Sequence, residues 1–258
     1  GLPPRTSRLV DWHFTPLAAP LLVGAALMAA VAAVAVRRES GRGGRTVALL
    51  ALAVAVYDLG YAGELGSAAP ADVRLWLKLQ YLGVVAVPGL VLVVALSYVG
   101  RRHFLSPLSL AGLFTIPATT LLLAFSNDAH ELVWRGLRVE HTTFTRTFFE
   151  AGPWYWVHNT YAQLVLLLAL ALLVRALLRA RGLIRRQFAA LLLALLAPLL
   201  LHVLYLSTPL FRGLDPNPYG LLVTAFVLAW GVLEVRLWDV VPVAREAVLA
   251  SMRDAVLV

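Results

Sequence analysis

The fold is decided by residues 73–99, which read VRLWLKLQYLGVVAVPGLVLVVALSYV. Apart from Arg74 and Lys78 near its start, this stretch carries no charged side chain. A helix that crosses the roughly 30 Å hydrocarbon core of a bilayer needs about 20 mostly apolar residues. The stretch therefore predicts a membrane-spanning helix.

Further runs of the same character occur along the whole chain. Together with residues 73–99 there are seven such runs: residues 16–36, 46–65, 73–99, 104–125, 157–178, 187–206 and 219–238. Of the 258 residues, 60% are hydrophobic and 14% charged, against about 45–50% and 25% in soluble domains. The predicted fold class is an all-α membrane protein, with a seven-transmembrane helix bundle over residues 1–238.

The net charge of +8 could indicate a nucleic-acid partner, but the positions of the charges favour a membrane orientation. The 1–2, 3–4 and 5–6 connections and the C-terminal tail together hold 14 Lys and Arg residues against 5 Asp and Glu, while the other side holds 8 against 9. Cytoplasmic loops of membrane proteins are enriched in Lys and Arg. The N-terminus is therefore predicted outside and the C-terminus in the cytoplasm, with no nucleic acid bound.

One long connection, residues 126–156, is predicted on the outer side. Residues 132–140 and 141–150 alternate apolar and polar side chains in part, which indicates a short extracellular β-hairpin between helices 4 and 5. Gly152-Pro153 ends it before the fifth helix.

Residues 239–258 differ from the bundle and are predicted to form a cytoplasmic signalling helix. Apolar side chains recur at helical spacing there, at Val241, Ala244, Val248, Met252 and Ala255. We expect this segment to lead into an output domain.

Ionisable and hydrogen-bonding side chains in membrane helices are costly and are candidates for function. Those predicted near the outer ends of the helices form the candidate ligand-binding set: Asp58, Tyr61, Glu64, Arg74, Lys78, Tyr81, His158, Tyr161, His202 and Tyr205. An ion pair of Glu64 with Lys78 or Arg74 would join two antiparallel neighbours, and it could equally be a structural pair that fixes helix packing. For the histidines, hydrogen-bonded packing is the competing interpretation.

Several classes of site are absent from the sequence. No cysteine is present, which excludes disulfides and thiolate sites. The histidines form no pair at ligand spacing, so no metal is predicted, and no cofactor either. Lys78 is the sole lysine and does not lie in the last helix, where a retinal Schiff base would need one. No nucleotide-binding or hydrolase motif occurs, so no enzyme activity is predicted for this chain.

The sequence resembles the N-terminal seven-helix sensor region of bacterial histidine kinases, a module that also precedes diguanylate cyclase domains. The stretches that carry the resemblance are residues 61–65 (YAGEL), residues 75–83 (LWLKLQYLG) with Pro88, Asn127 with His130 and Trp134, Gly152-Pro153 with Tyr161, residues 185–187 (RRQ) with Pro198, Asp215-Pro216, residues 236–245 (RLWDVVPVAR) and residues 252–258 (MRDAVLV). At Asp215-Pro216 the sequence departs from the family pattern, which usually keeps one more residue between Asp and Pro.

The resemblance implies that residues 1–238 form a multi-pass sensor domain in the bacterial plasma membrane, which responds to a small-molecule or lipid ligand. It implies a signal relay at the end of helix 7, through Arg236, Asp239, Pro242 and Arg245, and a homodimer in a full-length kinase. A small-solute transporter or channel is the alternative, and it would need a polar path to the inner face. An intramembrane enzyme would need a nucleophile and base, and the sequence offers no such pair.

Overall fold

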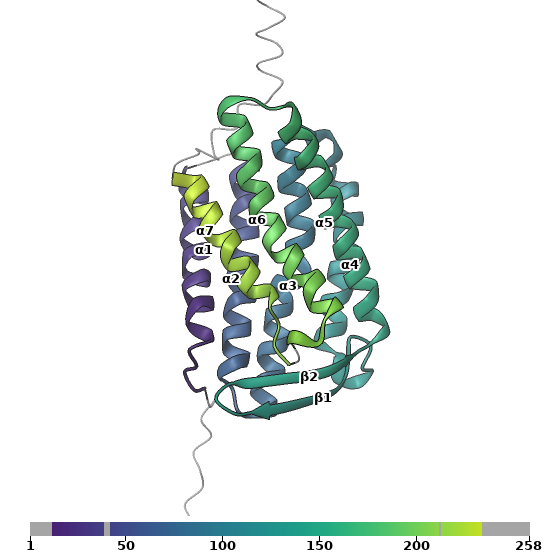
Figure 1. The fold of residues 1–258 in the computed structure, drawn as a ribbon. Helices are drawn as coiled ribbons and strands as arrows, with labels where there is room; N and C mark the ends of the chain where they lie inside the picture. Colours follow the sequence, from purple (N-terminus) through teal and green to yellow (C-terminus); the bar gives the residue numbers. More distant parts are fainter. Residues whose placement is uncertain (1–11, 39–41, 212, 234–258) are drawn as a thin grey trace, which may run out of the picture.

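The computed structural model describes residues 12–38, 42–211 and 213–233. In this part of the chain, long helices run side by side and a β-hairpin lies across one end of the bundle (Figure 1). The elements, in chain order, are α1 (Ala18–Arg38), α2 (Arg42–Gly66), α3 (Pro70–Tyr98), α4 (Pro107–Phe125), β1 (Trp134–His141), β2 (Thr145–Ala151), α5 (Pro153–Arg179), α6 (Gly182–Ser207) and α7 (Asn217–Leu233), with short 3-10 turns at Arg102–Phe104, Asn127–Ala129 and Pro209–Phe211.

The prediction of an all-α membrane bundle is confirmed. Six of the described helices, α1 to α6, are long and apolar enough to cross a membrane. The seventh predicted span corresponds to α7, whose 17 described residues end at Leu233. Large apolar side chains such as Leu108, Leu164 and Phe226 are exposed on the outside of the bundle, where a bilayer would cover them.

Local sequence explains where the helices start. Pro70, Pro107 and Pro153 stand in the first turns of α3, α4 and α5, where the missing N–H of proline costs nothing. Ser106 also caps α4, because its hydroxyl accepts a hydrogen bond from the Ser109 N–H at 3.2 Å.

Two prolines inside helices free carbonyl groups that side chains of the next helix satisfy. Pro198 has no N–H for the Ala194 carbonyl in α6, and the Thr224 hydroxyl of α7 donates to that carbonyl at 2.6 Å. Pro117 likewise has no N–H for the Leu113 carbonyl in α4, and the Tyr161 hydroxyl of α5 donates to that carbonyl at 2.8 Å. Each carbonyl that a proline leaves free is therefore satisfied by a neighbouring helix, as the absence of water in a bilayer demands.

Strands β1 and β2 form an antiparallel hairpin with Trp134 opposite Ala151 and His141 opposite Thr145. The sequence predicted the break between strands at residues 140 and 141, whereas the structure turns at residues 142–144. Thr145 fixes the hairpin to the end of α2, since its hydroxyl donates to the Ser67 carbonyl at 2.5 Å. Trp134 is buried at the other end of the hairpin and packs on Tyr81 of α3.

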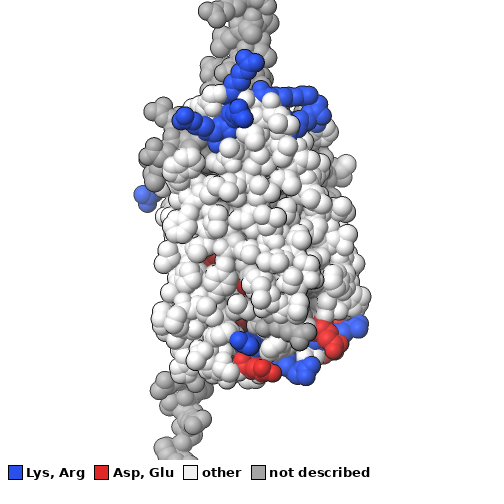
Figure 2. Space-filling view, viewed as in Figure 1, with Lys and Arg blue, Asp and Glu red and all other residues white. Residues whose placement is uncertain are grey.

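The two ends of the bundle carry different charges (Figure 2). At the end away from the hairpin, the described charged side chains are arginines, among them Arg37, Arg101, Arg179 and Arg186. At the hairpin end, basic and acidic side chains are mixed. We refer to these as the arginine end and the hairpin end.

Candidate functional site

A cavity of about 240 Å³ lies inside the bundle. Its walls come mainly from five helices that contact one another in a ring, in the order α2, α3, α5, α6, α7 and back to α2. The cavity is larger than an apolar cavity of about 150 Å³, which is enough to bind benzene.

The cavity is long, and its two parts differ. On α2 the lining runs from Leu50 to Glu64, which is about 21 Å along a helix at 1.5 Å per residue. Toward the arginine end the walls are aliphatic, for example at Leu173, Leu191 and Leu228. Toward the hairpin end they carry hydroxyl, amide, imidazole and carboxyl groups.

The structure gathers six of the ten predicted ligand residues around this cavity: Tyr61, Glu64, Tyr81, His158, His202 and Tyr205. The other four, Asp58, Arg74, Lys78 and Tyr161, do not line it. The helical spacing of Tyr61 and Glu64 with Tyr57 brings all three to the cavity, since residues three and four apart share a helix face.

Asp215 is the centre of a hydrogen-bond network that joins α2 to the start of α7. Its carboxylate accepts hydrogen bonds from the Tyr57 hydroxyl at 2.7 Å, the Asn217 N–H at 2.9 Å and the Asn217 side-chain amide at 2.6 Å. Its own N–H donates to the Tyr61 hydroxyl at 2.6 Å. Burial raises the pKa of Asp215 above its ordinary value, while the hydrogen bonds from Tyr57 and Asn217 act in the opposite direction.

His202 extends the network to α5 and α6. Its Nδ1 lies 3.1 Å from Oδ1 of Asn217, and its Nε2 lies 2.7 Å from Oδ1 of Asn159. One connected set of side chains thus links α2, α5, α6 and the first residue of α7. The start of α7 is therefore hydrogen-bonded, directly or through one further side chain, to each of the other three helices.

Glu64 is buried at the same end of the cavity and accepts a hydrogen bond from the Gln80 amide at 2.5 Å. Neither predicted ion pair forms: Lys78 and Arg74 make no ion pair with Glu64 among the described residues. Arg74 is exposed at the start of α3, and the backbone of α3 turns Gln80, not Lys78, toward Glu64. Gly60 permits this contact, because a Cβ there would lie 2.8 Å from the Gln80 Cα.

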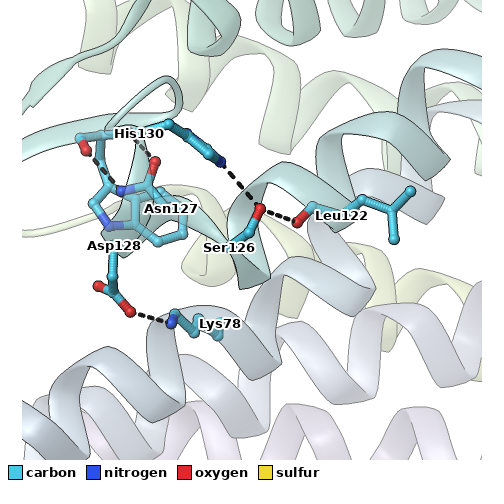
Figure 3. A network of polar contacts seen from close by, with 7 residues as sticks. Lys78, Leu122, Ser126, Asn127, Asp128 and His130 are labelled. Carbon is cyan, nitrogen blue, oxygen red and sulfur yellow. Dashed lines mark hydrogen bonds and ion pairs between the residues drawn. The ribbon is translucent and has the colours of Figure 1, made fainter.

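Lys78 instead pairs with Asp128, Nζ to Oδ2 at 2.5 Å, in the connection that follows α4 (Figure 3). Hydrogen bonding from Lys78 holds the pKa of Asp128 below its ordinary value. In the same connection the Ser126 hydroxyl donates to the Leu122 carbonyl and contacts His130 at 3.0 Å (Figure 3).

Asn127 fixes this connection to the hairpin. The side chain is 2% exposed, donates to the Trp134 carbonyl at 2.8 Å and accepts from the Val133 N–H at 2.9 Å. Asn127, Asp128 and Lys78 therefore position the hairpin over the bundle and do not reach the cavity.

Asp58 and Tyr161 have other environments. Asp58 is fully buried, and neither of its carboxyl oxygens has a hydrogen-bond partner among the residues that the structure describes. It occupies the space beside Gly24 of α1, where an added Cβ would lie 2.9 Å from Oδ2. Tyr161 satisfies the carbonyl that Pro117 frees.

His158 lines the cavity from α5 and is held by α4. Its Nδ1 lies 3.3 Å from the Thr120 hydroxyl, which also accepts a hydrogen bond from the Trp154 indole at 2.9 Å. The ring of His158 is thereby kept at the cavity wall.

Other lining residues were absent from the predicted set. Besides apolar side chains, they include polar groups at the hairpin end: Tyr57, Gln80, Thr147, Tyr155, Asn159, Asp215 and Asn217. The polar Asp215-Pro216-Asn217 run before an apolar helix was the available signal for two of them. The predicted relay residues Arg236, Asp239, Pro242 and Arg245 lie outside the described residues. No group of three or more His, Asp or Glu side chains suited to a metal ion occurs within the described ranges.

Comparison with known protein families shows what the chain is similar to. The family model described as the N-terminal 7TM region of histidine kinases matches residues 20–242. Among curated proteins, none matches the sequence. The matched residues include every helix of the ring and all of the described cavity lining.

Proposed function

The chain belongs to the N-terminal 7TM region of histidine kinases, and from this premise we propose that it senses a ligand in the central cavity and relays cavity occupancy through α7. The region is a multi-pass membrane sensor domain and is not itself catalytic. Beyond the family, we propose a ligand-binding site, a membrane orientation and an output domain for this chain.

The observation that carries the proposal is the position of the cavity inside the ring that includes α7. Tyr57, Asp215 and His202 line the cavity and also hold the start of α7. A ligand that displaces any of these groups alters the hydrogen bonds of α7 directly. Such a ligand shifts the population between two packings by its differential affinity for them.

The end of α7 would pass this shift to the segment beyond Leu233. The proposed relay residues there are Arg236, Asp239, Pro242 and Arg245, in a helix that pairs with its copy in a homodimer. The output is a histidine kinase, with a diguanylate cyclase as the other output that fits this type of sensor.

The proposed orientation puts the hairpin end outside the bacterial plasma membrane and the arginine end in the cytoplasm. Its support is the charge difference between the two ends together with the preference of cytoplasmic loops for arginine and lysine. Since the chain has no cysteine, Thr143→Cys in the hairpin turn and Arg181→Cys between α5 and α6 give single labelling sites. A membrane-impermeant maleimide should label T143C in intact spheroplasts and R181C only after permeabilisation; the reverse result would refute the orientation.

Ligand sensing is tested with a substitution that fills the cavity. Ala162 lines it from α5, whereas Ala118 is exposed on α4. In the full-length kinase, Ala162→Phe should fix the rate of autophosphorylation at one level whatever the growth condition, because the added ring occupies the ligand space. Ala118→Phe should respond as the wild type does. If both variants keep the wild-type response, the cavity does not control output.

Transport by the same cavity is the second candidate, and the existence of an internal space favours it. A transport path would have to cross the arginine half, where the lining is aliphatic. Glu64→Gln-sensitive flux of a solute in liposomes that contain the chain would support transport over sensing.

A further inference from the structure

The lining of the cavity restricts the chemistry of its ligand, if the cavity is the ligand site as proposed above. We infer that the ligand is a single-chain amphiphile with an aliphatic tail and an amine cation as its head group. The tail lies toward the arginine end and the head lies between Glu64 and the tyrosines of the hairpin end.

Size and shape support a single chain. By proportion to the cavity of about 150 Å³ that binds benzene, 240 Å³ holds roughly ten non-hydrogen atoms. The lining extends along α2 from Leu50 to Glu64, so these atoms must form an elongated molecule. A two-chain phospholipid is too large for this space.

The walls fix which end of the molecule lies where. Side chains in the arginine half of the lining, such as Val54 on α2, Val91 on α3 and Leu191 on α6, offer no hydrogen bond. A polar head placed among them would lose its hydration without compensation. The head must therefore lie at the hairpin end.

The charges at the hairpin end select a cation. Glu64 and Asp215 line the cavity, and the described lining residues include no Lys or Arg. Asp215 accepts three hydrogen bonds, from Tyr57 and Asn217, whereas Glu64 accepts one from the Gln80 amide and has the Thr147 hydroxyl beside it. A buried carboxylate without a partner cation is unfavourable. An ammonium group would provide both the charge and the N–H donors that Glu64 lacks.

The remaining polar groups at this end suit an ammonium and disfavour an anion. Tyr81, Tyr155 and Tyr205 line the cavity, and aromatic rings attract cations through their faces. The hydroxyl of Thr147 also lines it, beside Glu64, and its oxygen accepts no hydrogen bond from the described residues, so it can accept an N–H. The carboxylate of a fatty acid would instead face two carboxyl groups, with no described Lys or Arg in the lining to pair with it.

The inference is tested with three probes that share a ten-carbon chain and differ in the head: decylamine, decan-1-ol and decanoate. The chain is reconstituted in nanodiscs, and saturable binding of tritiated decylamine is measured after subtraction of binding to empty nanodiscs. We expect one decylamine per chain, at least tenfold weaker competition by decan-1-ol, and no competition by decanoate. This comparison uses the wild-type protein and does not depend on the folding of a variant.

Variants then locate the head and the tail. Glu64→Gln, which keeps the shape and removes the charge, should weaken decylamine binding at least tenfold and leave that of decan-1-ol unchanged. Glu150→Gln, on the exposed face of β2, is the matched control and should bind like the wild type. Ala162→Phe should abolish saturable binding, while Ala118→Phe should not.

The outcomes separate the ligand class from the sensor proposal. If decan-1-ol or decanoate binds as tightly as decylamine and Ala162→Phe blocks them all, the amine head is wrong and the cavity remains the ligand site. If no probe shows binding that Ala162→Phe blocks, the inference of an aliphatic amine is overturned. Sensing is then judged on the autophosphorylation test alone, which uses no probe.

Discussion

The hairpin end and the arginine end of this bundle are held together by different interactions. Near the hairpin, side-chain hydrogen bonds link four helices through Asp215 and His202. Toward the arginine end, the core is aliphatic, with Ala35, Val47, Leu173 and Leu191 in one cluster. A buried polar group that loses its hydrogen-bond partner is costly, whereas an aliphatic contact that opens slightly loses only part of its van der Waals attraction. On this difference rests our proposal that the hairpin end recognises the ligand and the arginine end transmits the change.

Of the substitutions at the hairpin end, removal of the Asp215 carboxylate should destabilise the protein most. Asp215→Ala leaves the Tyr57 hydroxyl and two Asn217 donors without their acceptor. We expect a loss of about 3 kcal/mol in the free energy of unfolding, measured by SDS titration in mixed micelles. Glu150→Ala, which removes an exposed carboxylate of β2, should change it by less than about 0.5 kcal/mol. Equal effects would mean that the network contributes nothing specific.

Close contact between α2 and α3 is the next requirement of the hairpin end. Gly60→Ala would push a methyl group into the backbone at Gln80 and should cost about 2 kcal/mol. Gly112→Ala on α4, where no atom lies within 4 Å, should be neutral or stabilise by up to about 1 kcal/mol. Thermal unfolding in detergent compares the two, and a tolerated G60A would contradict the contact.

The proline-linked hydrogen bond between α6 and α7 lies between the two ends and should have an intermediate effect. Thr224→Val removes the donor to the Ala194 carbonyl and should cost about 1 kcal/mol. In a Pro198→Ala background, the restored helical N–H satisfies that carbonyl, so the same substitution should cost much less. This double-mutant cycle measures the coupling, and additive effects would argue against it.

The exposed ion pair at the hairpin end should have the smallest effect, and one that depends on pH. Lys78→Met should cost about 0.5 kcal/mol at neutral pH. Because Lys78 lowers the pKa of Asp128, the pair stabilises the protein above the ordinary pKa of the carboxyl, about 3.9. The stabilisation is lost as the pH falls through the lowered pKa. The difference between K78M and wild type should therefore shrink toward about pH 3 and in high salt, and a difference that grows with acidity would refute the pair.

The helices were predictable because each needs only local sequence. A long apolar run requires a helix in a bilayer, and Pro70, Pro107 and Pro153 mark where three of them start. The hairpin was harder to place, since its turn at residues 142–144 is a run of Thr, Thr and Phe without a strong turn signal.

The cavity was predictable only in part, because depth in the membrane says nothing about which face of a helix a residue occupies. Asp58 follows Tyr57 by one residue, about 100° around the helix, and so faces α1 while Tyr57 faces the cavity. Tyr161 resembled a pocket residue, but its partner is the carbonyl freed by Pro117. The contact of Asp215 with Tyr57 joins positions 158 apart in sequence, which helical spacing cannot reveal.

The central claim is that the cavity controls α7, and a distance measurement on the cysteine-free chain tests it most directly. Nitroxides at Leu49→Cys on α2 and Trp230→Cys on α7, both exposed positions toward the arginine end, report how these helices lie. In nanodiscs, Ala162→Phe should shift the distance distribution measured by pulsed electron paramagnetic resonance, and Ala118→Phe should leave it as in the parent. Identical distributions in all three proteins would contradict the claim.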